Sequence, residues 1–468
     1  MSQPLYLFEA SIYTARRKEL MNTINDGLII MLGHEHSPIN YHDNYYPFRQ
    51  DSNFLYYAGL NMPHLAIVLD TQSGNAHLFG NDASIDHIVW MGPQPTMQEL
   101  GEKIGISNTH PYSRLEEVLN DAQSKNLNIH YLPPYRGEVI LKLSKLLGYS
   151  NDEVSQKASL SLINAVIAQR EIKGEEELVE MEKAVNLSAR MHHAVMRVTK
   201  EGVKESFLRG IIQQIVVDEE CQLAYGGIIT INGQTLHNES FHNVLKEGQL
   251  LLGDFGASSL MQYAGDITRT VPVSSKFTSQ QKEIYQIVLN AENKCIQSLK
   301  AGINYRDVHL NAARIIFDGL KDLGLTKGDA ETAVEKGAHA LFFPHGLGHM
   351  IGLDVHDMED LGENHVGYGA EFTRSTQFGL KSLRLAKTLQ EGFVLTVEPG
   401  IYFIPELIDR WKADGINADF INFSALDSYR SFGGIRIEDD VLVTSDGYRV
   451  LGDPIAKEID EVEALGSN

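Results

Sequence analysis

The alternation of apolar and polar positions divides the chain into two parts with different expected elements. In the first part, short apolar runs lie between turn-forming residues. Gly27–Gly33 predicts a buried strand, and Leu65–Leu69 and Ala76–Phe79, joined by the polar segment DTQSGN, predict a hairpin. Helices are expected at Leu115–Leu119 and Val139–Leu147. This mixture indicates an α/β domain, which we place at residues 1–168.

The second part, residues 169–468, combines longer helical patterns with strand-like runs. Leu178, Met181 and Val185 recur at spacings of three and four and predict a helix from Glu175. Thr278 and Gln281 fit a capping box for a second helix, and a third is expected over Tyr305–Leu323. Strands are expected at Ile228–Ile231, Gln249–Phe255, Ile267–Val273, Phe393–Val397 and Ile435–Val443. The pattern is typical of an α+β domain with an antiparallel sheet, and the last dozen residues resemble a solvated tail.

Composition and charge exclude several function classes. Among 468 residues, 43% are apolar and 22% charged, which is typical of a globular protein. The net charge of −22 argues against charge-driven binding to nucleic acid or to an anionic membrane. No run approaches 18 apolar residues and no secretory h-region opens the chain, so we expect a cytoplasmic protein. Of the two cysteines, Cys221 and Cys295, the second lies on an apolar helical stripe and is expected as a buried thiol.

Five potential metal ligands follow apolar runs in the second part of the chain. They are two Asp, one His and two Glu, in the order Asp254, Asp266, His349, Glu398 and Glu438. Four carboxylates gathered in a partly buried site would repel one another and lose hydration. Two divalent cations would cancel that charge, so the simplest interpretation is a two-metal hydrolytic centre. Oxygen ligands with one imidazole favour Mn²⁺, Co²⁺ or Zn²⁺.

Strand periodicity supports this interpretation. In FVLTVEPG, Thr396 and Glu398 share a face, and in GGIRIEDD, Arg436 and Glu438 point away from the apolar face. The two Asp lie twelve residues apart, and a hairpin could bring them across from each other. Each piece alone has a plain alternative: a Gly-Asp turn, two structural histidines at positions 345 and 349, a strand-end acid, or an exposed charged strand. Their combination in this order is the argument for a metal site.

The segments GDITR, HGLGHMIGLDVHD, LTVEPGIYF and GGIRIEDD resemble those of the metal-dependent pita-bread (creatinase-like) peptidases, within them the proline-specific branch of prolidase and aminopeptidase P. The resemblance extends over nearly the whole chain, because YPFRQDSNFLYYAGL at 46–60 resembles their N-terminal domain. It implies a C-terminal pita-bread catalytic domain with a smaller N-terminal α/β domain. It also implies an exopeptidase that hydrolyses Xaa-Pro bonds with two divalent ions per subunit, Mn²⁺ foremost.

The resemblance further implies residue roles. Asp254 would bind one metal, His349 and Glu398 the other, and Asp266 and Glu438 would bridge both. The implied catalytic residues are Glu398, which would also shuttle a proton, His237 and His356, and the implied substrate-binding residues are Arg384, Arg436 and His345. In one respect the chain departs from the family: the step from Asp254 to Asp266 is one residue longer. A longer hairpin turn would absorb it, whereas a register shift would turn one Asp away.

The choice of branch rests on the segment at 379–404 and the insert that follows, which resemble prolidase. There Arg384 would bind the carboxylate of a dipeptide, a task suited to a planar guanidinium. We therefore expect an Xaa-Pro dipeptidase. The alternatives are aminopeptidase P, which releases the first residue from longer peptides, and a mere loop salt bridge for Arg384.

The expected partners are short proline-containing peptides and a second copy in a homodimer, with the N-terminal domain over the neighbouring active site. A non-catalytic peptide- or histone-binding module is a remote alternative, disfavoured because all five ligands are present. Metal-free, creatinase-like hydrolysis is disfavoured for the same reason. The native metal, the residue preferred before proline and any organophosphate side activity are left open by the sequence.

Overall fold

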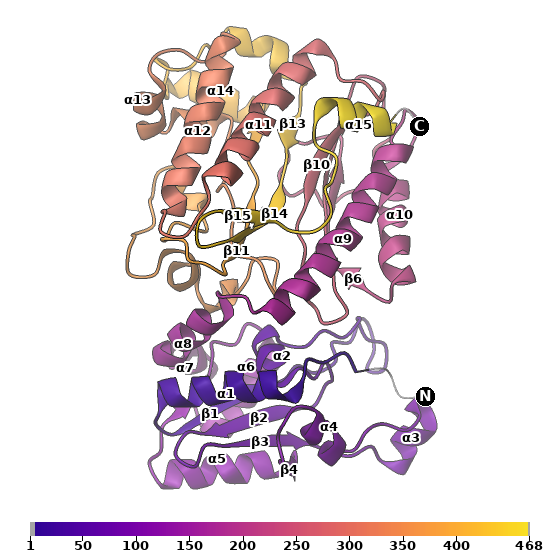
Figure 1. The fold of residues 1–468 in the computed structure, drawn as a ribbon, viewed down its shortest axis with the longest axis vertical. Coiled ribbons are helices and arrows are strands. Elements are labelled where there is room, and N and C mark those ends of the chain that lie inside the picture. The colour runs from indigo at the N-terminus through magenta and orange to yellow at the C-terminus, as the bar shows by residue number, and fades with distance from the viewer. Residues whose placement is uncertain (1–4, 467–468) are drawn as a thin grey trace. The chain divides into compact units, whose positions relative to one another are not determined.

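The computed structural model describes residues 5–466, and these form two compact units (Figure 1). One unit contains the chain up to Arg170 together with Met358–Gly362; the other contains Glu171–Asp357 and the chain from Glu363 onward. The boundary expected between 168 and 169 stays a prediction. Within residues 5–466, the helices are all too short or too polar to cross a membrane, and the cytoplasmic location also stays a prediction.

The first unit is built on a five-stranded sheet in the order β4-β3-β2-β1-β5. β1 pairs antiparallel with β2, and β2 with β3, whereas β4 and β5 add as parallel edge strands. The strands are β1 Leu28–Leu32, β2 Ala66–Asp70, β3 Asn75–Gly80, β4 Asn108–Pro111 and β5 Ile129–His130. The α/β character and the β2–β3 hairpin expected from the sequence are therefore confirmed.

Helices complete this unit and bury the sheet. Leu28, Ile30 and Leu32 alternate along β1 and pack with Leu119 of α5 and Leu143 of α6. The opposite side of β1 is buried too, which explains why its sequence reads as a continuous apolar run. The helices are α1 Ala10–Ile24, α2 Ser52–Ala58, α3 Ile85–Met91, α4 Met97–Lys103, α5 Arg114–Ser124, α6 Gly137–Leu147, α7 Asn151–Gln156 and α8 Leu160–Arg170, with the 3-10 turn η2 at Glu359–Leu361.

Long helices surround the strands of the second unit, with α9 beside α10 and α11 beside α12 (Figure 1). The expected capping box is confirmed: the Thr278 hydroxyl accepts from Gln281 N, and Gln281 Oε1 accepts from Thr278 N. The α-helices are α9 Glu175–Val198, α10 Glu205–Asp218, α11 Ser279–Ser298, α12 Tyr305–Asp322, α13 Ala330–Glu335, α14 Pro405–Asp414 and α15 Ile459–Gly466. Shorter turns are η1 Ala338–Leu341, η3 Asn364–Tyr368, η4 Leu380–Ser382 and η5 Ala425–Tyr429.

The strands of the second unit pair antiparallel in small sheets, as expected for an α+β domain. The orders are β10-β8-β7, β11-β14-β15, β12-β13 and β6-β9. The strands are β6 Gln222–Leu223, β7 Ile228–Thr230, β8 Leu250–Asp254, β9 Ala257–Ser258, β10 Thr268–Pro272, β11 Val394–Val397, β12 Gly400–Tyr402, β13 Gly434–Arg436, β14 Asp439–Val443 and β15 Tyr448–Val450. Isolated bridges join Thr268 to Glu438 and Met350 to Leu395, and so bring the sheets together around one centre.

Two expectations for this unit are wrong. The strand expected over Ile435–Val443 breaks at Ile437 and Glu438, because β13 pairs with β12 whereas β14 pairs with β11. The C-terminal segment is not a solvated tail: it forms α15, in which Val462 is buried. Glu463 of α15 is buried as well, and its carboxylate forms ion pairs with lysines of a distant segment, Lys276 and Lys282.

Candidate metal centre

The pairing of β8 with β10 brings Asp254 and Asp266 to the same region. Asp254 is the last residue of β8 and lies opposite Thr268, not opposite Asp266 as a simple hairpin would have it. Asp266 precedes β10 by two positions and is therefore diagonal to Asp254 on the same face. The connection between the strands contains β9 and a tight turn in which Gln262 adopts a φ of 71°. This connection accommodates the extra residue between the two Asp, and the β8–β10 register stays regular.

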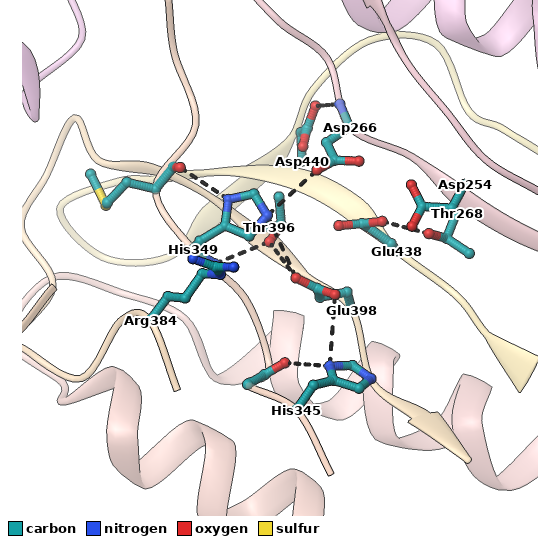
Figure 2. A network of polar contacts seen from close by, with 12 residues as sticks. Asp254, Asp266, Thr268, His345, His349, Arg384, Thr396, Glu398, Glu438 and Asp440 are labelled. Atoms are coloured by element: carbon teal, nitrogen blue, oxygen red, sulfur yellow. Dashed lines mark hydrogen bonds and ion pairs between the residues drawn. The ribbon is translucent and has the colours of Figure 1, made fainter. Parts of the chain in front are cut away.

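Asp266, His349 and Glu438 form the centre of the site. Each offers a ligand atom, these atoms lie within 4.8 Å of one another, and all three side chains are buried. His349 Nε2 lies 3.4 Å from Asp266 Oδ2 and 3.6 Å from Glu398 Oε1. Figure 2 shows these side chains directed toward one another, with Asp254 beside Glu438. The structure thus gathers side chains that are up to 184 positions apart in the sequence, the separation of Asp254 and Glu438.

Backbone contacts fix the orientation of the His349 ring. Nδ1 lies 3.0 Å from the Met350 carbonyl oxygen, so this nitrogen carries the hydrogen that it donates there. Nε2 is then the atom that faces Asp266 and Glu398. A ring held in this way by its second nitrogen is the arrangement commonly found for metal-binding histidines.

Two threonines hold the two glutamates. Thr268 Oγ1 donates to Glu438 Oε2 at 2.6 Å and accepts from Arg436 Nε at 3.2 Å. Thr396 Oγ1 accepts from His349 N at 3.1 Å and donates to Glu398 Oε1 at 3.4 Å. A threonine hydroxyl therefore orients each glutamate, so the glutamate side chain loses less conformational freedom when a ligand binds.

Tyr225 connects the two aspartates. Its hydroxyl lies 2.6 Å from Asp254 Oδ1 and 2.5 Å from Asp266 Oδ1. The other Asp254 oxygen, Oδ2, forms an ion pair with Arg436, whose guanidinium also donates to the Tyr402 hydroxyl at 2.7 Å. One phenol oxygen within reach of both carboxylates limits how far apart they can lie.

Burial and mutual repulsion shift the pKa values of the cluster. Burial, followed by Asp266, Glu398 and Asp254, raises the pKa of Glu438 well above its usual range. Burial raises the pKa of Glu398 to about 7, although His349 and Arg436 oppose the rise. Burial alone would lower the pKa of His349, but Asp266 and Glu398 outweigh it and raise the pKa to about 9. The protein matrix alone does not stabilise all the carboxylates in their charged form.

The donor set fits divalent cations. Four carboxylates, two of them buried and two partly exposed, meet one imidazole and one guanidinium, so acidic groups outnumber basic ones. Hard oxygen donors with a single nitrogen are the ligands that Mn²⁺, Zn²⁺ or Co²⁺ take in proteins. The hydrogen-bonded second layer of Thr268, Thr396 and Tyr225 is a further feature of metal sites.

The other residues expected at the site lie around this centre in different ways. His356 packs against His349, with ring centroids 4.3 Å apart. His345 contacts the Tyr402 hydroxyl through Nε2 at 2.8 Å, and its Nδ1 lies 3.8 Å from Glu398 Oε2. His237 is exposed on a loop and contributes to the lowered pKa of His345, after burial and Arg436. Arg384 forms an ion pair with Glu363 at 2.6 Å.

Several residues at the site were not identified from the sequence. Thr268 lies two positions from Asp266, so strand alternation could have identified it, and Thr396 was placed on the face of Glu398 without being given a role. Asp440, whose Oδ2 accepts from Asp266 N at 2.9 Å, was visible only as part of an acidic run. Tyr225 carried no signal, because a tyrosine beside two glycines is typical of many loops.

Comparison with protein families gives two matches that together span most of the chain. The model of metallopeptidase family M24 matches residues 179–445. The model of the aminopeptidase P N-terminal domain matches residues 13–130.

Individual relatives agree with these matches. A probable Xaa-Pro aminopeptidase of Fusarium vanettenii is 35% identical over 427 residues, 90% of this chain and 88% of that protein. The human Xaa-Pro dipeptidase is 31% identical over 455 residues, 93% of this chain and 88% of that protein. Among solved structures, a variant of aminopeptidase P of Escherichia coli in complex with substrate superposes with a TM-score of 0.81 at 26% identity and 98% coverage of both chains.

Proposed function

The chain belongs to metallopeptidase family M24, and from that premise we propose that it is a metallo-exopeptidase that hydrolyses the peptide bond between a first residue and a following proline. The observation that carries the proposal is the buried cluster of Asp266, His349 and Glu438, whose ligand atoms face one another and whose carboxylates cannot all be charged without added cations. The relatives named Xaa-Pro aminopeptidase and Xaa-Pro dipeptidase support proline as the second residue.

The proposed metal ligands are the five residues singled out in the sequence: Asp254, Asp266, His349, Glu398 and Glu438. They would hold two divalent ions, and Mn²⁺ is our first choice ahead of Co²⁺ and Zn²⁺. The chemistry that such ions supply is a nucleophilic water at neutral pH and a polarised substrate carbonyl. Support comes from the donor atoms that face one another and from the threonines and the tyrosine that orient them.

Glu398 is the proposed proton carrier. Its carboxylate lies between the Thr396 hydroxyl and His345 and is 18% exposed, so one side is held while the other can reach a water molecule. In the proposed reaction it takes a proton from the attacking water and delivers it to the proline nitrogen. That nitrogen leaves as a secondary amine, and without the proton it would be a poor leaving group.

Histidines beside the centre are proposed to bind the substrate. His356, packed on His349, would donate to the oxygen of the tetrahedral intermediate. His237 is exposed in its loop, and it would approach the peptide from a segment other than the one that carries His345 and His356. Arg436 would act mainly through Asp254 and Tyr402, which it already contacts.

Between the two branches we favour the dipeptidase. Arg384 is 31% exposed and already pairs with a carboxylate, so a second carboxylate at a dipeptide C-terminus suits it chemically. The test compares Ala-Pro with Ala-Pro-Ala-Ala. Arg384→Ala should lower kcat/KM for the dipeptide roughly tenfold to a hundredfold, the usual loss for a charged hydrogen bond, and leave the tetrapeptide nearly unchanged. A wild-type preference for the tetrapeptide would instead assign the chain to aminopeptidase P.

A homodimer is also proposed, and α3 supports it. Ile85, Val89 and Trp90 of this helix are 77%, 74% and 85% exposed, and none of its residues is buried. Adjacent large apolar side chains of this kind are typical of interaction surfaces, and a second copy would cover them. Sedimentation at micromolar concentration should give a dimer, and Trp90→Glu should shift it toward monomer. A monomeric wild type would contradict the proposal.

A further inference from the structure

Glu363 is bound by two arginines close to the metal centre. Its Oε1 lies 2.6 Å from Arg384 Nη1, and its Oε2 forms an ion pair with Arg374 Nη2. The three side chains, which we call the Glu363 cluster, are 24% to 31% exposed. Two guanidinium groups thus share one carboxylate in a place that solvent can reach.

The backbone around the cluster is built to hold it. Tyr368 donates to the Leu383 carbonyl at 2.7 Å, and Ala386 N donates to Gly367 O at 2.8 Å. A Cβ on Gly367 would come within 1.7 Å of Arg384 O, so the two segments approach as closely as only glycine allows. The Arg374 guanidinium lies over the Tyr368 ring, 5.2 Å from its centroid. The turn η3 and the segment 382–387 therefore form one local scaffold for both arginines.

The same scaffold lies against the loop that carries the histidines. A Cβ on Gly346 would lie 3.0 Å from Leu383 Cα and 3.3 Å from Arg384 N. Gly346 follows His345, and the next residue, Leu347, accepts a hydrogen bond from Glu398 N at 2.8 Å. Figure 2 draws Arg384 in one view with His349 and Glu398. The arginine is thus anchored beside the proposed catalytic residues by backbone contacts.

We propose that Glu363 is an internal substitute for the C-terminal carboxylate of the substrate. It neutralises Arg384 while no peptide is bound and gives way to the carboxylate of a dipeptide, which presents the same planar pair of oxygens. Partly exposed ion pairs contribute little free energy, so the exchange is easily reversed. Arg374 makes the exchange favourable, because it keeps Glu363 paired after release and leaves the cluster with one positive charge in excess.

This inference rests on the proposed function and narrows its substrate class. Peptides whose free carboxylate lies one residue beyond the scissile bond are selected, whereas the same peptides with an amidated end are not. Removal of the competing Glu363 should then lower KM for the free dipeptide, whereas removal of Arg374 should raise it. If the cluster had a purely structural role, its variants would instead shift KM for the free and the amidated peptide in the same direction.

The experiment measures kcat and KM of the Mn²⁺-loaded protein for Ala-Pro and for Ala-Pro amide. Glu363→Gln should lower KM for Ala-Pro about twofold to fivefold, the value of one exposed ion pair, and leave the amide unchanged. Arg374→Met should raise KM for Ala-Pro by a similar factor, because Glu363 then pairs with Arg384 alone. Arg384→Met should give the same KM for the two substrates, both in the Glu363→Gln background and in the Arg374→Met background.

Glu371→Gln is the matched control. Glu371 lies in the same insert and accepts hydrogen bonds from Thr388, not from arginine, so its variant should behave as wild type. An unchanged KM in Glu363→Gln, or equal shifts for acid and amide, would overturn the inference and leave the proposed function standing. If the wild type hydrolyses neither peptide, the proposed function fails. Calorimetric titration with Ala-Pro, which is then not consumed, still measures the exchange.

Discussion

The Tyr225 hydroxyl lies 2.5 Å from Oδ1 of Asp266, and the same oxygen is 2.6 Å from Oδ1 of Asp254. A hydroxyl has one proton, so it can donate to only one of these carboxylates at a time. Tyr225 therefore acts as a spacer between two proposed ligands, one at the end of β8 and the other two positions before β10. The sequence separates it from them by 29 and 41 positions, and only the fold brings the three together.

Tyr225→Phe should weaken metal binding without unfolding the protein. The ring keeps its packing, but the two aspartates lose their common partner, and second-layer losses of this kind cost roughly tenfold to a hundredfold in metal affinity. Calorimetric titration of the metal-free protein with Mn²⁺ measures the change. Tyr285→Phe is the control, because its buried hydroxyl donates to the Lys457 carbonyl, away from the centre. Equal Mn²⁺ affinity in wild type and Tyr225→Phe would refute the spacer role.

Thr268→Val should reduce kcat of the Mn²⁺-loaded enzyme, because Glu438 and Arg436 both lose the Thr268 hydroxyl. Valine has nearly the same shape, so the change removes polarity and little volume. A lost hydrogen bond to a buried charged group costs about 1–3 kcal/mol. Steady-state kinetics on Ala-Pro, with metal content measured on the same sample, gives the effect. Thr268→Ser restores the hydroxyl and should recover most of the rate; a serine variant as poor as the valine variant would point to packing instead.

Acid should destabilise the fold through a histidine pair outside the proposed ligand set. His309 and His339 are buried, and within residues 5–466 none of their ring nitrogens has a hydrogen-bond partner. Burial lowers the pKa of His339 to about 4, and burial followed by His339 lowers that of His309 well below the usual range. The unfolded chain titrates near 6.5, so it takes up protons first and stability falls as pH drops below about 7.

For His339 the loss between pH 7.5 and pH 5 amounts to about 2 kcal/mol. Urea denaturation midpoints at the two pH values measure it, in wild type and in His339→Phe. The phenylalanine variant should lose that part of the pH dependence, whereas His42→Gln, at a histidine whose side chain is 93% exposed, should retain it. Parallel pH profiles for wild type and His339→Phe would contradict the assignment.

Local pattern was sufficient to predict elements with a clear apolar period, whereas others, such as α1 and α10, were not predicted. β1 and α9 were predicted correctly because burial imposes a period on the sequence, of two along a strand and of three to four along a helix. The break at Ile437 and Glu438 could not be predicted, because the alternation of Ile435, Arg436, Ile437 and Glu438 continues through it. The strand breaks because its pairing partner changes from β12 to β11, and local alternation does not predict which strands pair. α15 was missed for a similar reason, since lysines from another segment neutralise its buried Glu463.

The candidate site shows the same division. The sequence indicated the ligand types, because buried carboxylates in number need compensation. It did not indicate the register in which Asp254 faces Thr268, nor Tyr225, which joins two strands from a third segment. Arg384 was expected to meet a substrate carboxylate, and its partner Glu363 emerged only from the structure.

The most direct test of the central claim measures metal content and Xaa-Pro hydrolysis in the same sample. Protein stripped with a chelator is titrated with Mn²⁺, bound metal is counted after gel filtration, and Ala-Pro hydrolysis is followed at each step. We expect no hydrolysis without metal and full activity at two ions per chain. Full activity in the stripped protein, or no hydrolysis of any Xaa-Pro peptide with two ions bound, would contradict the central claim.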